Sequence, residues 1–368
     1  MNSLVRYQIA LLLIEGLGAQ KASLLLSAVG KPEDIFTSPD KLFRRLPGIG
    51  ETIVHRIRKF SKWDEVDSIL QKTEKTGCWL ISISDEEYPE ALRHIHTPPL
   101  LLWGIGDKKV LNTVSLAVIG TRRPTTYGIE MASHFSTKII EKGFTIISGL
   151  ALGVDTIAHK SAIDNNRTTI AVLGSGIDVI YPYQNKSLVN KIVETNGAVI
   201  SEFPPGSKPD AKNFPTRNRI VSGMSKGVLV VESEVTGGSM ITANLALEQG
   251  REVFVIPHQL KSERGKGCNS LIKSGAGKLV QNEQDIFEEF EYLFEEVTTQ
   301  SKEVKQNTDS LNDFQKSIVD LISNNEMHID DMAHQLKKPT GELLVELLEL
   351  EMSGFVKALQ GKRYITQQ

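Results

Sequence analysis

Residues suited to holding a phosphate follow five apolar runs in the middle of this sequence. They are Gly120, Thr121, Arg122 and Arg123, then Ser148 and Gly149, then Gly174, Ser175 and Gly176, then Arg217, Asn218 and Arg219, and last Gly237, Gly238, Ser239 and Thr242. Glycines let the backbone approach a ligand closely, and free N–H groups at a helix start attract anions. Arginine adds bidentate contacts to phosphate oxygens. One such loop is often only a tight turn, but five together predict a site for a phosphate-bearing ligand.

These loops lack the fingerprints of the common nucleotide-dependent enzymes. A dinucleotide site needs G-x-G-x-x-G after its first strand, whereas this chain has GTRRPTTYG from residue 120. The run GSGIDV from residue 174 lacks the third glycine, and no G-x-x-x-x-G-K-[ST] loop occurs. Nicotinamide and ATP chemistry are therefore not indicated, and we expect no cofactor.

Few side chains have the sequence surroundings of a catalytic group. The chain contains no HExxH, GxSxG or CxxC motif. His159 fits packing or hydrogen bonding inside a helix better than the role of a base. Asp155 fits equally well as a helix-start residue near the positive end of the helix dipole and as a functional acid. His258, Glu232 and Glu234 have no evident partner in the sequence. We expect no catalytic residue and no metal site.

Six apolar runs of strand length must position these loops: residues 116–121, 144–150, 168–174, 198–203, 227–233 and 252–257. Segments with helical spacing separate them, at residues 127–143, 154–164, 185–197, 217–226 and 239–250. Runs that are apolar on both faces are typical of a parallel sheet covered by helices. We therefore predict an α/β fold with a Rossmann-like, doubly wound, mostly parallel sheet over residues 81–297. Ligands of such sheets bind at the carboxyl ends of the strands, where the loops would converge.

Residues 1–80 are expected to form a small helical domain, with 12 basic and 9 acidic side chains. Two segments there, EGLGAQKASLLL from Glu15 and PGIGETIVHRI from Pro47, place an apolar residue between two glycines before a helix start. The pattern resembles the helix-hairpin-helix of sequence-independent DNA binders. Five cations surround the second copy: Arg44, Arg45, Arg56, Arg58 and Lys59. Direct DNA contact and an ordinary turn in a helical bundle are both compatible with these residues.

The C-terminal part of the chain predicts a linker followed by a winged helix. Residues 298–310 are polar without apolar periodicity, which is typical of a linker. Residues 311–368 read as three helices and a hairpin that turns near Gln360 and Gly361. Residues 291–368 carry 8 basic and 14 acidic side chains. Because acidic surface repels phosphate, contact with a protein is favoured over contact with DNA for this domain.

The bulk composition predicts a cytoplasmic protein without a membrane segment. The net charge of the 368 residues is −3, so any nucleic-acid site must be a local patch. Cys78 and Cys268 lie far apart in the sequence and fit a reducing compartment. The apolar run near the N-terminus is interrupted by charges and lacks a cleavage site, so it indicates a helix and not a signal peptide. No stretch approaches the roughly 20 apolar residues of a membrane span.

Seven blocks in the same order resemble the DNA-processing protein A family, also called Smf. They are VIGTRRPTTYG, SGLALGVDTIAHKSA, AVLGSGIDVIYP, SEFPPG, FPTRNRIVSGMS, VVESEVTGGSMITANLALEQGREVFVIP and GCNSLIKSGA. They cover about residues 85–280. The flanks fit too, because many members have a helical N-terminal domain and a C-terminal winged helix.

The resemblance implies a recombination mediator and not an enzyme. Members bind and protect single-stranded DNA, act in natural transformation and DNA recombination, and load the RecA recombinase past single-strand-binding protein. They are typically homodimers. The matching motifs assign Arg122, Arg217 and Arg219 to a positively charged DNA pocket, with Lys186 as a further candidate. The floor of that pocket would consist of Gly120, Ser148, Gly149, Gly174, Ser175, Gly176, Gly238 and Ser239.

This chain departs from the family pattern at two positions. Leu152 stands where SGLARG would place an arginine, so one cation is missing near the pocket. His258 stands where VPG would place a glycine, which bears on the shape of that loop. The sequence does not choose among Phe214, Tyr181 and Tyr183 as a base-stacking residue.

The first alternative is a nucleotide-processing enzyme that resembles the cytokinin-activating phosphoribohydrolases. Their P-G-G-x-G-T-x-x-E motif ends in a glutamate that does chemistry. The matching segment here is TGGSMITANL, which places Ala243 and Asn244 near that position, with Glu248 one helical turn further on. The second alternative is a nucleotide-sensing module without catalysis.

Overall fold

The computed structural model describes residues 3–293, 311–322, 326–353, 355–359 and 361–366. The chain divides into two compact units, Met1–Glu289 and Phe290–Gln368. The linker expected at residues 298–310 lies outside the described residues.

A nine-stranded sheet is the centre of the first unit, with the strand order β1-β2-β6-β5-β4-β3-β7-β8-β9. Its strands are β1 (Trp79–Ser82), β2 (Leu101–Gly106), β3 (Ser115–Ile119), β4 (Thr145–Ser148), β5 (Thr169–Leu173), β6 (Ala198–Ser201), β7 (Gly227–Val230), β8 (Glu252–Val255) and β9 (Lys278–Leu279). From β6 through β5, β4, β3, β7 and β8 to β9, neighbouring strands pair in parallel. At the other end of the sheet, β1 pairs antiparallel with β2, and β2 pairs antiparallel with β6. The predicted fold class and all six predicted strands, β3 to β8, are confirmed.

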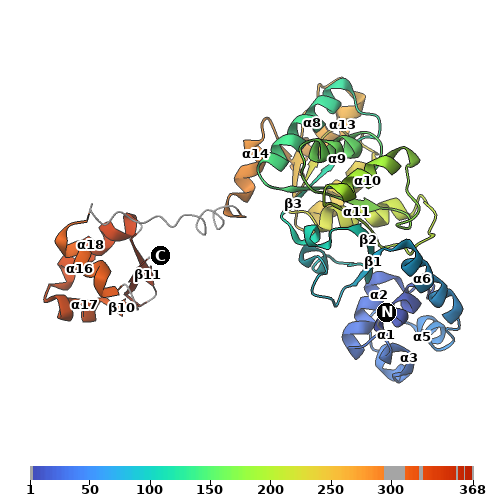
Figure 1. The fold of residues 1–368 in the computed structure, drawn as a ribbon, viewed down its shortest axis with the longest axis horizontal. Helices are drawn as coiled ribbons and strands as arrows, with labels where there is room; N and C mark the ends of the chain where they lie inside the picture. The colour runs from blue at the N-terminus through green and yellow to red at the C-terminus, as the bar shows by residue number, and fades with distance from the viewer. Residues whose placement is uncertain (1–2, 294–310, 323–325, 354, 360, 367–368) are drawn as a thin grey trace. The chain divides into compact units, whose positions relative to one another are not determined.

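Helices between these strands cover the sheet (Figure 1). They are α8 (Thr126–Glu141), α9 (Val154–Asp164), α10 (Lys186–Glu194), α11 (Asn213–Gly223) and α12 (Gly238–Glu248), and shorter elements are α7 (Glu90–Arg93), α13 (Lys266–Lys273) and α14 (Gln284–Phe287). The first five match the predicted helical segments. Helix α8 begins where it does because the Thr125 hydroxyl accepts a hydrogen bond from the Gly128 amide at 3.1 Å, an N-cap that satisfies a free N–H.

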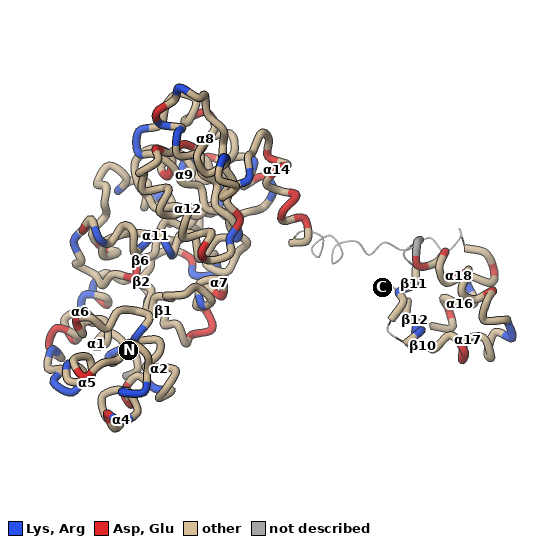
Figure 2. The backbone as a smooth tube through the Cα atoms, turned by 180° about the vertical axis from the view of Figure 1, so that it is seen from behind, with Lys and Arg blue, Asp and Glu red and all other residues tan. Residues whose placement is uncertain are grey.

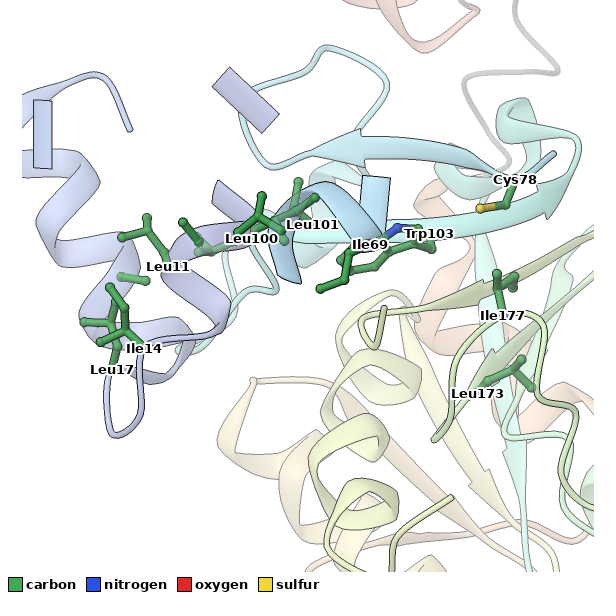
Figure 3. Packing of buried hydrophobic residues seen from close by; sticks show 14 of the residues in the cluster. Leu11, Ile14, Leu17, Ile69, Cys78, Leu100, Leu101, Trp103, Leu173 and Ile177 are labelled. Carbon is green, nitrogen blue, oxygen red and sulfur yellow. The ribbon is translucent and has the colours of Figure 1, made fainter. Parts of the chain in front are cut away.

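Six helices precede the sheet: α1 (Ser3–Leu12), α2 (Gly18–Val29), α3 (Asp34–Thr37), α4 (Asp40–Phe43), α5 (Glu51–Arg58) and α6 (Trp63–Thr76). They share one apolar core with the edge of the sheet, in which Leu11 and Ile69 belong to the same cluster as Trp103 and Leu173 (Figure 3). The Trp103 indole also donates to the hydroxyl of Thr73 on α6 at 3.0 Å. The N-terminal helices therefore pack directly against the sheet, and the domain boundary that we placed at residue 80 stays a prediction.

The second unit is a small winged-helix fold. Helices α16 (Asp313–Ile322), α17 (Ile329–Leu336) and α18 (Thr340–Met352) pack with a three-stranded sheet of β10 (Met327–His328), β11 (Val356–Leu359) and β12 (Arg363–Thr366). Its core includes the fully buried side chains of Ile318, Met332 and Leu343. The predicted winged helix is confirmed. Among the described helices, none has both the length and the apolar character needed to cross a bilayer.

Candidate functional site

A pocket of about 840 Å³ opens at the carboxyl ends of the parallel strands. The loops after β3 and β4, the loop that leads into α12, and helix α11 contribute to its wall. The predicted site residues on this wall are Gly120, Thr121, Arg122, Arg123, Gly149, Arg217, Asn218, Gly237, Gly238, Ser239 and Thr242. These residues come from segments far apart in the sequence, and parallel pairing brings them to one edge of the sheet.

The exposed cations of the pocket lie on the loop after β3. Arg122 and Arg123 are both exposed and line the pocket. A third guanidinium, that of Arg264, also lines it and donates to the carbonyl of Arg123 at 2.8 Å. Sequence reasoning missed Arg264 because it precedes α13, after a strand whose loop carries no glycine-rich pattern. Two carboxylates, Asp155 and Glu234, are also on the wall.

Arg217 forms a buried part of the same wall. The residue is only 4% exposed, and its Nη1 donates to the carbonyls of Gly149, at 2.5 Å, and of Val172. Its Nε has no hydrogen-bond partner among the described residues. Burial lowers the pKa of Arg217 to about 10, although Asp155 opposes this shift. The guanidinium is therefore still charged at neutral pH, beneath a pocket that already holds three other arginines.

Asp155 holds the loop after β4 from its other side. Its carboxylate accepts hydrogen bonds from the amides of Gly149, at 3.1 Å, and Ala151, at 3.2 Å. Burial raises the pKa of Asp155, and the nearby Arg217 opposes that shift. A Cβ built on Gly149 would lie 2.6 Å from Nη1 of Arg217, so a larger residue there would have to displace this guanidinium. Of the two interpretations from the sequence, the helix-start role of Asp155 is the one its contacts support.

An aromatic pair stands at the pocket wall. The rings of Tyr181 and Phe214 lie 5.6 Å apart at 46°, and the Arg122 guanidinium lies 5.7 Å from the centre of the Phe214 ring. Both rings also line an adjoining recess of about 40 Å³, together with Leu152. Tyr183 is 74% exposed and belongs to neither lining. Of the three aromatic candidates for base stacking, Phe214 and Tyr181 therefore line the pocket and Tyr183 does not.

Arg219, which the family resemblance implied as a pocket residue, is engaged elsewhere. Its guanidinium forms a bidentate pair with Glu202, with Nη2 to Oε2 at 2.6 Å, and its Nε donates to the carbonyl of Thr97 at 2.9 Å. Neither side chain is more than 12% exposed. The residue is absent from the pocket lining because α11 turns it away from Arg217, two positions earlier.

Several other predicted residues lie behind or beside the pocket. The Ser148 and Ser175 hydroxyls donate to the carbonyls of Val118, at 2.7 Å, and Val179, at 2.6 Å. Gly174 lies beneath Phe214, since a Cβ built on Gly174 would be 2.8 Å from that ring. Gly176 is buried and does not line the pocket. Lys186 does not line it either, because its exposed side chain lies beside the Tyr183 ring.

His159, His258 and Glu232 each contact a polar group within the fold. His159 is fully buried, its Nδ1 is 2.8 Å from the Thr169 hydroxyl, and burial lowers its pKa to about 3. The Nε2 of His258 lies 2.8 Å from the carbonyl of Val231, so the loop accommodates this residue. Glu232 is fully buried and accepts from the amide of Thr125 at 2.9 Å. In the described part of the chain, no group of three or more His, Cys, Asp or Glu side chains could hold a metal.

The helix-hairpin-helix segments carry fewer free cations than the sequence suggests. Arg44 pairs with Glu51 at 2.7 Å, Arg56 with Glu15 at 3.3 Å, and Arg58 with Asp40 at 2.7 Å. Among the cations around the second copy, Arg45 and Lys59 are the exposed ones for which the described residues supply no ion pair. Direct DNA contact by these turns stays a prediction.

Three family models match successive parts of this chain. Residues 79–291 match the family model of DNA recombination-mediator protein A, residues 302–362 the DprA winged helix domain, and residues 9–62 a SAM-like helix-hairpin-helix tandem. Protein Smf of Escherichia coli is 37% identical over 80% of this chain and 79% of its own length.

Two solved structures are similar as well. The X-ray structure of DNA processing protein A from Streptococcus pneumoniae has a TM-score of 0.66 at 34% identity, and covers 77% of this chain and 98% of that one. A structure of DNA processing protein A from Helicobacter pylori, described for its single-stranded DNA binding mode, has a TM-score of 0.52 at 31% identity. It covers 59% of this chain and 96% of that one.

Proposed function

Because the chain belongs to the DNA recombination-mediator protein A family, and so has a role in DNA processing and recombination, we propose that its pocket binds single-stranded DNA. The observation that carries the proposal is the gathering of four guanidinium groups and two aromatic rings around one opening, from Arg122, Arg123, Arg217, Arg264, Tyr181 and Phe214.

The chemistry of this wall fits a nucleotide chain better than an isolated phosphate. Arg122 and Arg123 are exposed and offer N–H donors to backbone phosphates at little desolvation cost. Phe214 and Tyr181 offer ring faces on which unpaired bases can stack, which is how proteins hold single strands without reading their sequence. In a duplex the bases are already stacked and paired, so the aromatic faces would gain no contact. The pocket therefore favours the single strand.

We extend the proposal to the wider role that the family resemblance implies. The protein would act in the cytoplasm as a homodimeric mediator that protects incoming or exposed single strands and loads RecA onto them, past single-strand-binding protein. Such a role requires binding and release without chemistry on the DNA. Asp155, one of the two carboxylates on the pocket wall, is engaged by backbone amides, and Glu248 is absent from the lining.

Titration of a fluorescent oligo-dT with the full chain tests the binding proposal. We expect an affinity that falls steeply as salt increases, because each neutralised phosphate releases counterions, with a slope of roughly 0.7 per contact for single strands. Blunt duplex of the same length should bind more weakly. Equal affinity for both forms would refute single-strand selectivity. Release of base from a nucleoside monophosphate by the same preparation would instead favour the phosphoribohydrolase alternative.

A further inference from the structure

The loop after β6 connects the pocket to helix α6. Pro209 and Ala211 of this loop line the pocket. Gly206, three residues before Pro209, lies against α6, because a Cβ built on Gly206 would be 3.4 Å from the Lys72 ammonium nitrogen. Figure 1 shows this yellow-green loop beside α6. Three residues span at most about 11 Å, so Lys72 is close to the rim of the pocket.

Hydrogen bonds hold this loop in place. The Gly206 amide donates to the Asp178 carboxylate at 2.7 Å, and Gly206 has a φ of +87°, a conformation that favours glycine. The Ser207 carbonyl accepts from the amide of Gly176 at 2.9 Å. The Asp210 carboxylate accepts from the backbone amide of Lys212 at 2.9 Å. The position of the loop against Lys72 is therefore built into the fold, and both nearby carboxylates already serve backbone amides.

The cations along this path are free, unlike several in the N-terminal helices. Lys72, Lys208 and Lys212 are exposed, and within the residues that the structure describes their ammonium groups form no hydrogen bond or ion pair. By contrast, Arg6 on the neighbouring α1 pairs with Asp67 of α6 at 2.8 Å. An exposed ammonium without a carboxylate partner can neutralise a phosphate without first breaking an ion pair. Figure 2 shows basic residues on both α6 and the region around α11 and β6.

We propose that a single strand leaving the pocket runs along residues 204–212 onto helix α6, where Lys72 neutralises one of its phosphates. This inference rests on the proposed function. It assigns the N-terminal helical segment a DNA-contact surface on α6, a place distinct from the two helix-hairpin-helix turns. A short oligonucleotide would fill only the pocket, whereas a longer one would also reach Lys72.

The test is a length series of oligo-dT, from about 4 to 20 nucleotides, titrated with the full-length chain and its Lys72→Ala variant. For the shortest strands that bind, both proteins should have the same affinity. For the longest strands, the variant should bind about two- to fivefold more weakly, as expected for an exposed ion pair. Its salt slope with long strands should be smaller by roughly 0.7, the loss of one phosphate contact.

Lys62→Ala is the matched control. Lys62 is the residue at the start of the same helix, about 15 Å from Lys72 along the helix axis. Its ammonium lies 3.6 Å from the Glu65 carboxylate. This variant should bind every length as the unmodified protein does, and Lys72→Arg should keep the gain in affinity with length. If the thermal unfolding midpoint of Lys72→Ala equals that of the unmodified chain, the fold of the variant is intact.

The outcomes separate this inference from the proposed function. If Lys72→Ala binds long strands as tightly as the unmodified chain, the path over α6 is wrong while binding in the pocket stands. If the variant loses affinity equally at every length, Lys72 acts by shaping the loop and the path is again wrong. If the unmodified chain binds no oligonucleotide of any length, the proposed function itself fails, and this inference with it.

Discussion

Arg219 and Glu202 form a bidentate ion pair, with Nη1 to Oε1 at 2.7 Å and Nη2 to Oε2 at 2.6 Å, that is almost inaccessible to solvent. The pair links α11 to the segment after β6, while Arg217 on the same helix faces the pocket. Two arginines separated by one residue in FPTRNR thus have different surroundings, and this difference is open to measurement.

Arg219→Ala is expected to destabilise the fold instead of removing a phosphate contact. It leaves the Glu202 carboxylate buried without its partner, which costs about 3 kcal/mol in comparable pairs. Urea unfolding should therefore show a lower midpoint, and replacing both residues together by Met and Leu should recover much of the loss. A reduced salt slope of oligonucleotide binding with an unchanged unfolding midpoint would place Arg219 in the DNA site after all.

Arg122→Ala is expected to weaken binding to every oligonucleotide sequence alike. The loss of one phosphate contact should amount to roughly 1–2 kcal/mol, and the salt slope should fall by roughly 0.7. Fluorescence anisotropy with oligo-dT, oligo-dC and a mixed sequence measures both. Arg167→Ala is the control, because this exposed arginine lies just before β5, at the opposite end of that strand from the pocket. Equal losses in the two variants would show only a general effect of net charge.

Phe214→Ala and Tyr181→Ala are each expected to reduce the affinity by about 1–3 kcal/mol, the range for a stacked base. Tyr183→Ala should have little effect, since Tyr183 lies outside the pocket. Comparing oligo-dT with an abasic strand of the same length isolates the stacking contribution. If the abasic strand loses nothing in the unmodified protein, the aromatic pair does not hold bases.

Leu152→Arg is expected to strengthen binding several-fold. The salt slope of binding should increase by roughly 0.7, the value for one additional phosphate contact. Leu152 is 37% exposed beside Tyr181 and Phe214, so a guanidinium there can reach a bound strand while keeping its hydration. The same change at Leu348, which is exposed on α18, controls for added charge. No gain over the Leu348 variant would mean that the bound strand does not pass the recess.

His159 is expected to make the free energy of unfolding depend on pH between about 6.5 and 3. Its pKa is about 3 in the folded chain, from an ordinary value of 6.5, because burial disfavours the charged ring. The unfolded chain therefore binds the extra proton in this window, and stability falls as pH decreases, with a slope approaching 1.4 kcal/mol per pH unit. Urea unfolding at pH 7, 6 and 5 should show a shallower slope for His159→Asn than for the unmodified chain. Identical slopes would exclude this histidine as the cause.

Much of the fold and the pocket could be predicted from local patterns. Runs of residues that are apolar on both faces of a strand identified strands β3 to β8. Glycines and hydroxyl side chains after these strands identified the loops that meet at one edge of the sheet. Strands β1 and β2 were not predicted, and neither was the core that Trp103 shares with the N-terminal helices. That core joins residues more than 30 positions apart, and no periodicity within a segment encodes it.

The sequence alone determined the alternation of strands and helices, because side-chain periodicity is a property of neighbouring residues. It also determined which edge of the sheet collects the candidate phosphate-binding loops. Only the tertiary structure decided which cations are free to bind. Arg219 meets Glu202 seventeen positions away, Arg264 joins Arg123 from 141 positions away, and Lys72 lies beside Gly206. Burial and ion pairing depend on contacts between distant segments, and those contacts exist only once the chain has folded.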